Sequence, residues 1–230
     1  MARIFSVLAL LAVLLLASNF VLGLAGGDFN GAARAKREAQ RKYLELDRTS
    51  RGARQVDSQE LQAAREAAAE ADQQFARPRS WMTLHMLLGS AAALITVLVN
   101  SITITYFIGT SRWCKEVCAT YRLSADLAQR STQLKRGTFP WALAGILSII
   151  AVVGFGAAAD ASGANWQNSA SFVLPHYVVA MLAMVVVCVA FWMQIQRIAE
   201  NHVVIDEILA EVQQIRAERG LPTPAAAASI

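Results

Sequence analysis

Apolar and polar positions divide the chain into four long apolar runs separated by polar segments. The runs cover residues 4–25, 81–108, 141–159 and 172–195, and none of them contains Asp, Glu, Lys or Arg. A helix of about 20 apolar residues crosses the roughly 30 Å hydrocarbon layer of a membrane. Because a helix satisfies its own backbone hydrogen bonds in lipid, the pattern predicts an all-α, polytopic membrane protein with four transmembrane helices.

The same pattern predicts how the chain is organised around these helices. In chain order we expect transmembrane helix 1 at 1–25, an extracytoplasmic α-helical hairpin at 26–80, transmembrane helix 2 at 81–109, a basic helical cytoplasmic loop at 110–138, transmembrane helix 3 at 139–159, a short outer loop at 160–171, transmembrane helix 4 at 172–196, a cytoplasmic amphipathic, coiled-coil-like helical extension at 197–219, and a disordered tail at 220–230.

The distribution of basic residues predicts which side of the membrane each loop faces. The loop at 110–138 holds six Lys and Arg against two Asp and Glu, whereas 160–171 holds no Lys or Arg. Lys and Arg are enriched in cytoplasmic loops, so both chain termini are expected in the cytoplasm of a multi-pass cell-membrane protein. Segment 26–80 carries eleven Lys and Arg with nine Asp and Glu, and segments of that length cross with less regard to charge.

The first apolar run has a second interpretation. Arg3 precedes it, and it ends in Gly23-Leu24-Ala25-Gly26, which is similar to the small-residue site cut by signal peptidase. The run exceeds the usual length of about 7–15 apolar residues, which favours an uncleaved anchor. Cleavage would leave three spans with the same sidedness.

The polar segment 26–80 has the composition of two antiparallel helices. Helix-forming Ala, Arg, Lys, Glu and Gln dominate residues 29–50, a break follows at Thr49-Ser50-Arg51-Gly52, and Pro78 is expected to end the second helix. Its apolar content is too small to stabilise two helices alone. It is therefore either a solvated, fraying hairpin or an arm that binds a protein partner or associates with itself.

Polar side chains interrupt the inner half of the second run. Asn100, Ser101, Thr103 and Thr105 occur there, and hydroxyls in lipid bond to a carbonyl one turn earlier or to a neighbouring helix. Helix packing is the simpler interpretation of this stripe, and the lining of a polar pathway is the alternative. Pro140 directly precedes the third run, and we expect it in the first turn of that helix.

The fourth run continues into an amphipathic pattern without a stop signal. Ile198, Ile205 and Val212 recur every seven residues, and Gly220 and Pro222 are expected to end the helix. The stripe predicts either packing on the loop at 110–138 of the same chain or formation of a homodimer.

Composition limits the chemistry. The 230 residues are 55% apolar and 17% charged, with a formal charge of +4, and the basic residues flank the apolar runs. This predicts contact with the lipid bilayer, and phospholipid head groups rather than nucleic acid as the polar partner. The four runs contain no Asp, Glu, Lys or Arg. Proton pumps and ion-coupled carriers place such ionisable side chains within the membrane, so their absence argues against both functions.

Two sets of side chains are candidate ligand sites. His85 and His176 stand about one turn inside the outer ends of the second and fourth runs, so they could be axial ligands of a b-type haem, although histidines bonded to water or carbonyls at an interface are commoner. Cys114 and Cys118 share one helix face, and with His202 they could bind zinc, although cysteines at this spacing often pack as apolar residues.

The sequence favours a non-enzymatic function. No motif for phosphate binding, metalloprotease or serine-nucleophile chemistry is present. We expect an assembly, scaffold or interaction subunit that acts through its helical arms, as a homo-oligomer or with a membrane-protein partner. The alternatives are a small cytochrome-like electron-transfer subunit and a transport or channel subunit.

Overall fold

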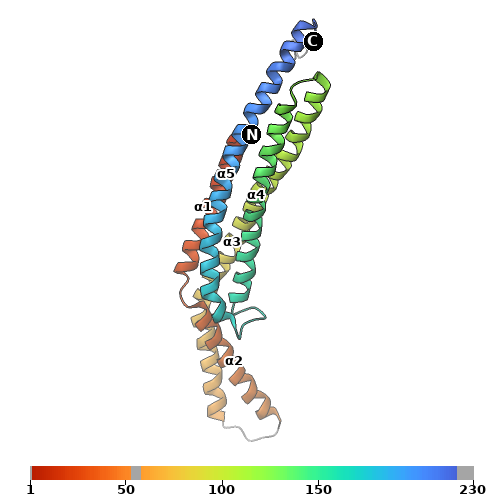
Figure 1. Ribbon diagram of the computed structural model, residues 1–230. Coiled ribbons are helices and arrows are strands. Elements are labelled where there is room, and N and C mark those ends of the chain that lie inside the picture. Colours follow the sequence, from red (N-terminus) through yellow and green to blue (C-terminus); the bar gives the residue numbers. More distant parts are fainter. Residues whose placement is uncertain (1, 53–57, 222–230) are drawn as a thin grey trace. The chain divides into compact units, whose positions relative to one another are not determined.

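The computed structural model describes residues 2–52 and 58–221, and within them the chain forms five α-helices. These are α1 (Ala2–Ala25), α2 (Phe29–Arg51), α3 (Ser58–Tyr121), α4 (Ala125–Ala159) and α5 (Ser169–Glu218), labelled in Figure 1. The helices α1, α3, α4 and α5 are long and apolar enough to cross a membrane by length and composition. The prediction of an all-α chain with four such helices is confirmed.

The helices contribute to two compact units. Unit 1 contains α1 up to Val13, α3 from Leu94, α4 up to Ile149 and α5 from Val185. Unit 2 contains the remainder of α1, all of α2, the first part of α3, the end of α4 and the start of α5. The chain therefore passes from one unit to the other along each of its four long apolar helices.

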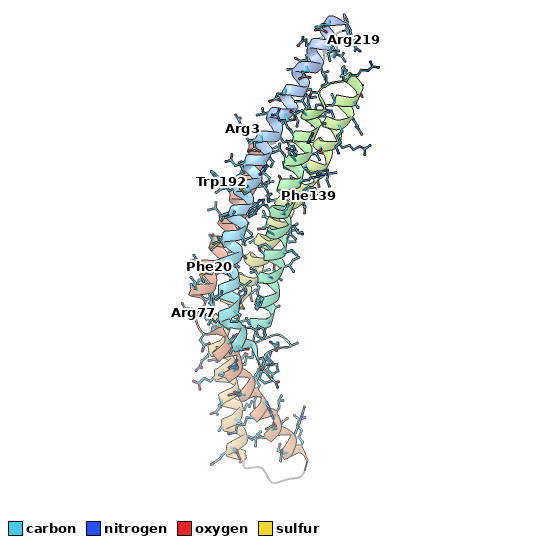
Figure 2. All side chains as sticks on the ribbon, viewed as in Figure 1. Arg3, Phe20, Arg77, Phe139, Trp192 and Arg219 are labelled. Carbon is cyan, nitrogen blue, oxygen red and sulfur yellow. The ribbon has the colours of Figure 1, made fainter. Side chains whose placement is uncertain are left out.

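The outward surfaces of the long helices are apolar. Leu94 on α3, Leu174 on α5 and Trp192 on α5 are 72%, 70% and 63% exposed, and Trp192 projects away from its helix in Figure 2. A water-soluble bundle would bury such side chains. This surface is suited to contact with a lipid bilayer.

The helices run through two prolines that were expected to mark helix boundaries. Pro78 lies inside α3 and Pro140 inside α4, so the predicted stop at Pro78 and the predicted start of a helix at Pro140 are wrong. A proline removes one backbone hydrogen bond and crowds the preceding turn. Packing offsets this cost at Pro78, because Phe75 before it and Met82 after it contact the same apolar cluster.

The core of unit 1 is built from α3, α4 and α5. The buried positions of α4 are Leu127, Ser131, Leu134, Thr138, Ala142, Gly145 and Ile149. On α5, Val187, Gln194, Asn201 and Ile208 are fully buried at intervals of seven residues. The buried positions of α4 are three or four residues apart, and those named on α5 are seven apart. Both spacings are typical of coiled-coil packing, in which side chains of one helix fill gaps between those of its neighbours.

The amphipathic stripe at the end of α5 packs within its own chain. Ile198 and Ile208 are buried in unit 1, and Arg130 on α4 bonds both carboxylate oxygens of Glu207 on α5, at 2.5 and 3.2 Å. The stripe therefore makes contacts of the kind expected for packing on the segment 110–138 of the same chain, and the homodimer stays a prediction.

The end of α5 follows the glycine signal. Gly220 has a φ of +66°, and the N–H groups of Gly220 and Leu221 donate to the carbonyls of Ala217 and Arg216. A left-handed glycine with this pair of bonds closes many helices. Pro222 and the predicted disordered tail from residue 222 onward lie outside the described residues.

In unit 2, the hairpin segment is attached to the rest of the unit rather than standing free. Phe29, Ala33, Phe75 and Ala161 form a buried cluster, which joins α2 and α3 to the turn that follows α4. Arg37 donates to the Ser162 carbonyl at 2.9 Å and lies over the Trp166 ring. We call α2 together with α3 up to Ser80 the arm.

An ion pair adds to the contact between the two helices of the arm. Lys36 on α2 pairs with Asp72 on α3, and its ammonium also lies over the Phe75 ring. The hydrogen bond from Lys36, helped by its charge, holds the pKa of Asp72 below its usual value. One narrow face of α2 is thereby fixed, while its opposite face is exposed.

Candidate functional site

Asn100 and Thr103 of the second apolar run form a buried hydrogen-bond network with Gln194 in unit 1, whereas the hydroxyls of Ser101 and Thr105 are exposed and donate to carbonyls of their own helix. Asn100 on α3 donates through Nδ2 to the Thr96 carbonyl at 2.8 Å and accepts at Oδ1 from Gln194 Nε2 on α5, also at 2.8 Å. Thr103 Oγ1 lies 2.7 Å from Gln194 Oε1. All three side chains are fully buried, and each amide oxygen and nitrogen has at least one partner.

A glycine of α4 lets this network form. A Cβ on Gly145 would lie 2.9 Å from Oδ1 and 3.0 Å from Nδ2 of Asn100. At these distances the Asn100 amide would have to move away. The absence of a side chain at this position allows the α4 backbone to contact the amide directly. Small residues at helix contacts serve the same purpose in many membrane proteins.

A second polar layer lies seven residues further along α5. Asn201 accepts at Oδ1 from the Ser131 hydroxyl of α4 at 2.8 Å, and its Nδ2 donates to Tyr106 and Thr110 of α3 at 3.1 Å each. One asparagine therefore bonds both neighbouring helices. Ser131 and Asn201 are fully buried.

The two layers favour helix packing over a polar pathway. Their side chains donate to and accept from one another across three helices, and the Asn100 amide is pressed against backbone at Gly145. Buried polar groups at coiled-coil positions fix which turn of one helix faces which turn of the next. The network thus sets the register of α5 against α3 and α4.

Sequence reasoning identified one side of this network and missed the other. Asn100 and Thr103 were singled out, but Gln194 and Asn201 were not. A signal for both was present, because they occupy the same seven-residue repeat as the buried Val187 and Ile208. Polar residues at core positions of a repeat predict partners on the facing helices.

The two histidines of the predicted haem site lie in unit 2. His85 Nδ1 is 3.2 Å from the Asn19 carbonyl of α1, which can only accept, so Nδ1 carries the proton and the neutral ring keeps its lone pair at Nε2. His176 Nδ1 is buried and has no hydrogen-bond partner among the described residues. The two rings are near enough for an electrostatic interaction.

Each histidine ring fills a gap opposite a glycine on a neighbouring helix. His85 Cε1 is 3.0 Å from the position of a Cβ on Gly23, and His176 Cε1 is 3.1 Å from that on Gly156. Close helix packing alone is sufficient to explain these contacts. The assignment of His85 and His176 as axial ligands stays a prediction, supported by the free nitrogen of His176.

The three residues of the predicted zinc site are not brought together. Cys114 and Cys118 are buried on the inner face of α3, whereas His202 is on an exposed face of α5 and its Nδ1 bonds Asp206 at 2.8 Å. Within residues 2–52 and 58–221, no group of three or more His, Cys, Asp and Glu side chains could hold a metal ion. The cysteines have the surroundings of apolar packing residues.

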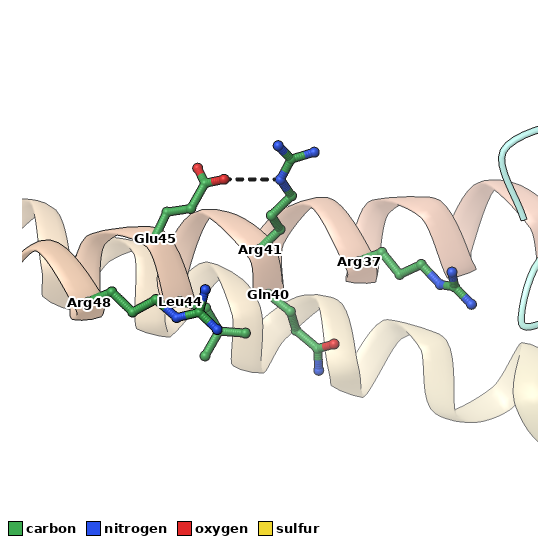
Figure 3. A pocket seen from close by; sticks show the side chains of 6 residues that line it. All are labelled: Arg37, Gln40, Arg41, Leu44, Glu45 and Arg48. Carbon is green, nitrogen blue, oxygen red and sulfur yellow. Dashed lines mark hydrogen bonds and ion pairs between the residues drawn. The ribbon is translucent and has the colours of Figure 1, made fainter.

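Two shallow depressions mark the surface outside the apolar runs. One, of about 330 Å³, lies on α2 alone and is lined by Arg37, Gln40, Arg41, Leu44, Glu45 and Arg48, as Figure 3 shows. The other, of about 360 Å³, lies between α3 and α4 of unit 1 and contains Lys115 and Arg136. Neither has the paired acid, base or nucleophile that catalysis needs.

The Asn100–Gln194 pair is expected to behave as a coupled unit. Asn100→Leu removes the acceptor of Gln194 Nε2 and should lower the free energy of unfolding by about 1–2 kcal/mol, because a buried donor is left unpaired. The double variant Asn100→Leu/Gln194→Leu should recover most of that loss. Equilibrium unfolding in mixed micelles measures both, with Ser101→Ala, an exposed hydroxyl, as the control. The coupling would be contradicted if the double variant lost as much free energy of unfolding as Asn100→Leu and Gln194→Leu lose together when each is measured alone.

The buried thiols of Cys114 and Cys118 are expected to react slowly. Burial raises the pKa of Cys114 and of Cys118, and the thiolate is the nucleophile, so fewer thiolates form near neutral pH. In a Cys188→Ser background at pH 8, maleimide should label the folded protein at least tenfold more slowly than the unfolded chain. The difference should shrink as the pH rises above the ordinary thiol range. Equal labelling rates at pH 8 would show that these thiols are open to solvent.

The scan against protein-family models, the search of curated proteins and the search of solved structures each found no match. The interpretation of the site therefore depends on the contacts described above.

Proposed function

We propose that this chain is a multi-pass integral membrane protein that acts as a non-enzymatic assembly or interaction subunit. The observation that carries the proposal is the arm of unit 2. The start of α2 is fixed by the Phe29–Phe75 cluster and the Lys36–Asp72 pair, and further along the helix Leu44 is exposed between Arg41 and Arg48. An apolar side chain in a basic surround suits a protein partner with an apolar and acidic surface.

The lengths of the helices support this assignment. α3 has 64 residues and α5 has 50, whereas about 20 suffice to cross a bilayer. At about 1.5 Å per residue, α3 measures roughly 96 Å along its axis. Much of both helices therefore extends beyond the membrane, where it can contact other proteins.

The proposal includes an orientation. The loop around 110–138 is basic and the turn after α4 has no Lys or Arg, so we place both termini in the cytoplasm and the arm outside it. The first helix is proposed as an uncleaved anchor, since Phe5 of α1 packs edge-on against Phe191 of α5 in unit 1.

Site-directed labelling tests the orientation. Gln74→Cys in the arm and Gln214→Cys near the end of α5 place thiols at exposed positions. A membrane-impermeant maleimide should label the first variant in intact cells and the second only after permeabilisation, because the reagent cannot cross the bilayer. The reverse pattern would invert the proposed topology.

The exposed face of α2 provides the test of assembly. Leu44→Glu should remove the interaction and leave the chain at its monomer mass in mild detergent, because the substitution puts a charge into the apolar part of the contact. Gln73→Glu, at an exposed position of α3 in the same arm, is the matched control and should retain the larger mass. Light scattering of the purified protein measures both.

A monomeric wild-type protein in native-membrane extracts would overturn the assembly proposal. So would a Leu44→Glu variant with the mass of the wild type. Because Leu44 is half exposed and outside the buried cluster, its substitution leaves the packing of the arm intact.

Electron transfer is the second candidate function, and one observation favours it. His176 Nδ1 is buried without a partner, and His85 Nε2 has a free lone pair in the neutral ring. These nitrogens would hold a haem iron, which supplies one-electron chemistry when bound. A haem absorption band in the purified protein that disappears in His176→Ala would support it, and a colourless preparation from haem-replete cells would exclude it.

A further inference from the structure

A basic groove in unit 1 lies between the end of α3 and the start of α4. It encloses about 360 Å³, and its walls are formed by Lys115, Ala125, Ala128, Gln129, Thr132, Gln133 and Arg136. Lys115 comes from α3 and all the others from one face of α4. At the contact between the two helices, the hydroxyls of Ser111 and Thr132 lie 3.4 Å apart.

The groove carries positive charge without a balancing carboxylate. Lys115 and Arg136 are exposed, and no ion pair joins either to another described residue. Of the nearby carboxylates, Glu116 bonds Arg112 at 2.7 Å, and Asp126 adds an electrostatic attraction to Arg130, whose own ion pair is with Glu207. Two cations facing one groove favour a ligand with negative charge.

The position of the groove along the helices points to the membrane surface. Lys115 follows the last apolar residue of the second run, Ile108, by seven residues, and Arg136 precedes Trp141 by five. At about 1.5 Å per residue, these distances are roughly 10 and 8 Å. The polar head groups occupy about this depth outside the hydrocarbon layer, and Lys and Arg side chains extend along it.

We propose that this groove binds the head group of an anionic phospholipid. Lys115 and Arg136 pair with the phosphate of the lipid, whose head group carries a net negative charge. The exposed amides of Gln129 and Gln133 donate hydrogen bonds to head-group oxygens. The inference rests on the membrane location in the proposed function, but not on the arm or on any protein partner.

The depth of the groove distinguishes a lipid from a soluble ligand. A free phosphate or an acidic peptide would need no basic residues so close to an apolar run. Arg197 of α5 also lies near this depth, with its guanidinium 3.5 Å from the position of a Cβ on Gly137, and it pairs with Glu200 at 3.9 Å. Cationic side chains of three helices, namely Lys115, Arg136 and Arg197, therefore meet the same head-group layer.

Native mass spectrometry of the full chain in detergent tests the proposal. The probes are phosphatidylglycerol, which is anionic, and phosphatidylcholine, which is zwitterionic, each titrated against the wild type and two variants. Lys115→Gln/Arg136→Gln removes the groove charges. Lys135→Gln/Arg219→Gln removes the same net charge from residues that do not line the groove.

The wild type should bind phosphatidylglycerol at least tenfold more tightly than phosphatidylcholine, and the groove variant should lose about that factor. The control variant should keep the preference. Equal losses in both variants would overturn the proposal, because they would show a general surface-charge effect. Displacement of the lipid by millimolar inorganic phosphate or by an acidic peptide would also overturn it, by assigning the groove to a soluble ligand.

Carbonate extraction of the same cells separates this inference from the proposed function. If the chain is released from the membrane, the membrane proposal fails and the lipid inference fails with it. If the chain stays in the membrane but shows no lipid preference, the groove inference alone fails.

Discussion

The structure of unit 1 depends on one constraint, which is that a polar side chain buried among apolar helices has to find a partner on another helix. Gln194 meets it through Asn100 and Thr103, and Asn201 meets it through Ser131, Tyr106 and Thr110. Apolar contacts are nearly interchangeable between neighbouring turns, whereas these bonds form in one register. Two such layers, seven residues apart on α5, therefore define how α3, α4 and α5 meet.

Polar side chains have a different role in unit 2. The arm is held by a small aromatic and alanine cluster, by the Lys36–Asp72 pair and by Arg37 on the turn after α4. These contacts hold the first half of α2, and further along the helix Leu44 is exposed between Arg41 and Arg48. A helix that is fixed near its start and exposed further along is suited to presenting a surface, which is why the arm rather than the apolar helices carries the proposed interaction.

Local rules predicted helix identity better than helix boundaries. Pro78 and Pro140 were expected to mark boundaries, because proline lacks an amide hydrogen and crowds the preceding turn. Both lie inside continuous helices. Phe75 and Met82 pack on either side of Pro78, and the buried Thr138 and Ala142 flank Pro140, so packing on both sides of each proline offsets the lost backbone hydrogen bond. Gly220 behaved as expected because the closing bonds of a helix end involve only its own last turns.

The sequence by itself determined that the chain is all-α with four helices long and apolar enough to cross a membrane, since an uncharged apolar run is recognised without reference to any other segment. It also determined the repeat of α5 and the end of that helix at Gly220. Only the tertiary structure decided which polar groups meet. The Asn100–Gln194 bond joins residues 94 positions apart, and the separation of His202 from Cys114 and Cys118 depends on how α5 is rotated against α3. Those relations are set by packing between helices, which no local pattern encodes.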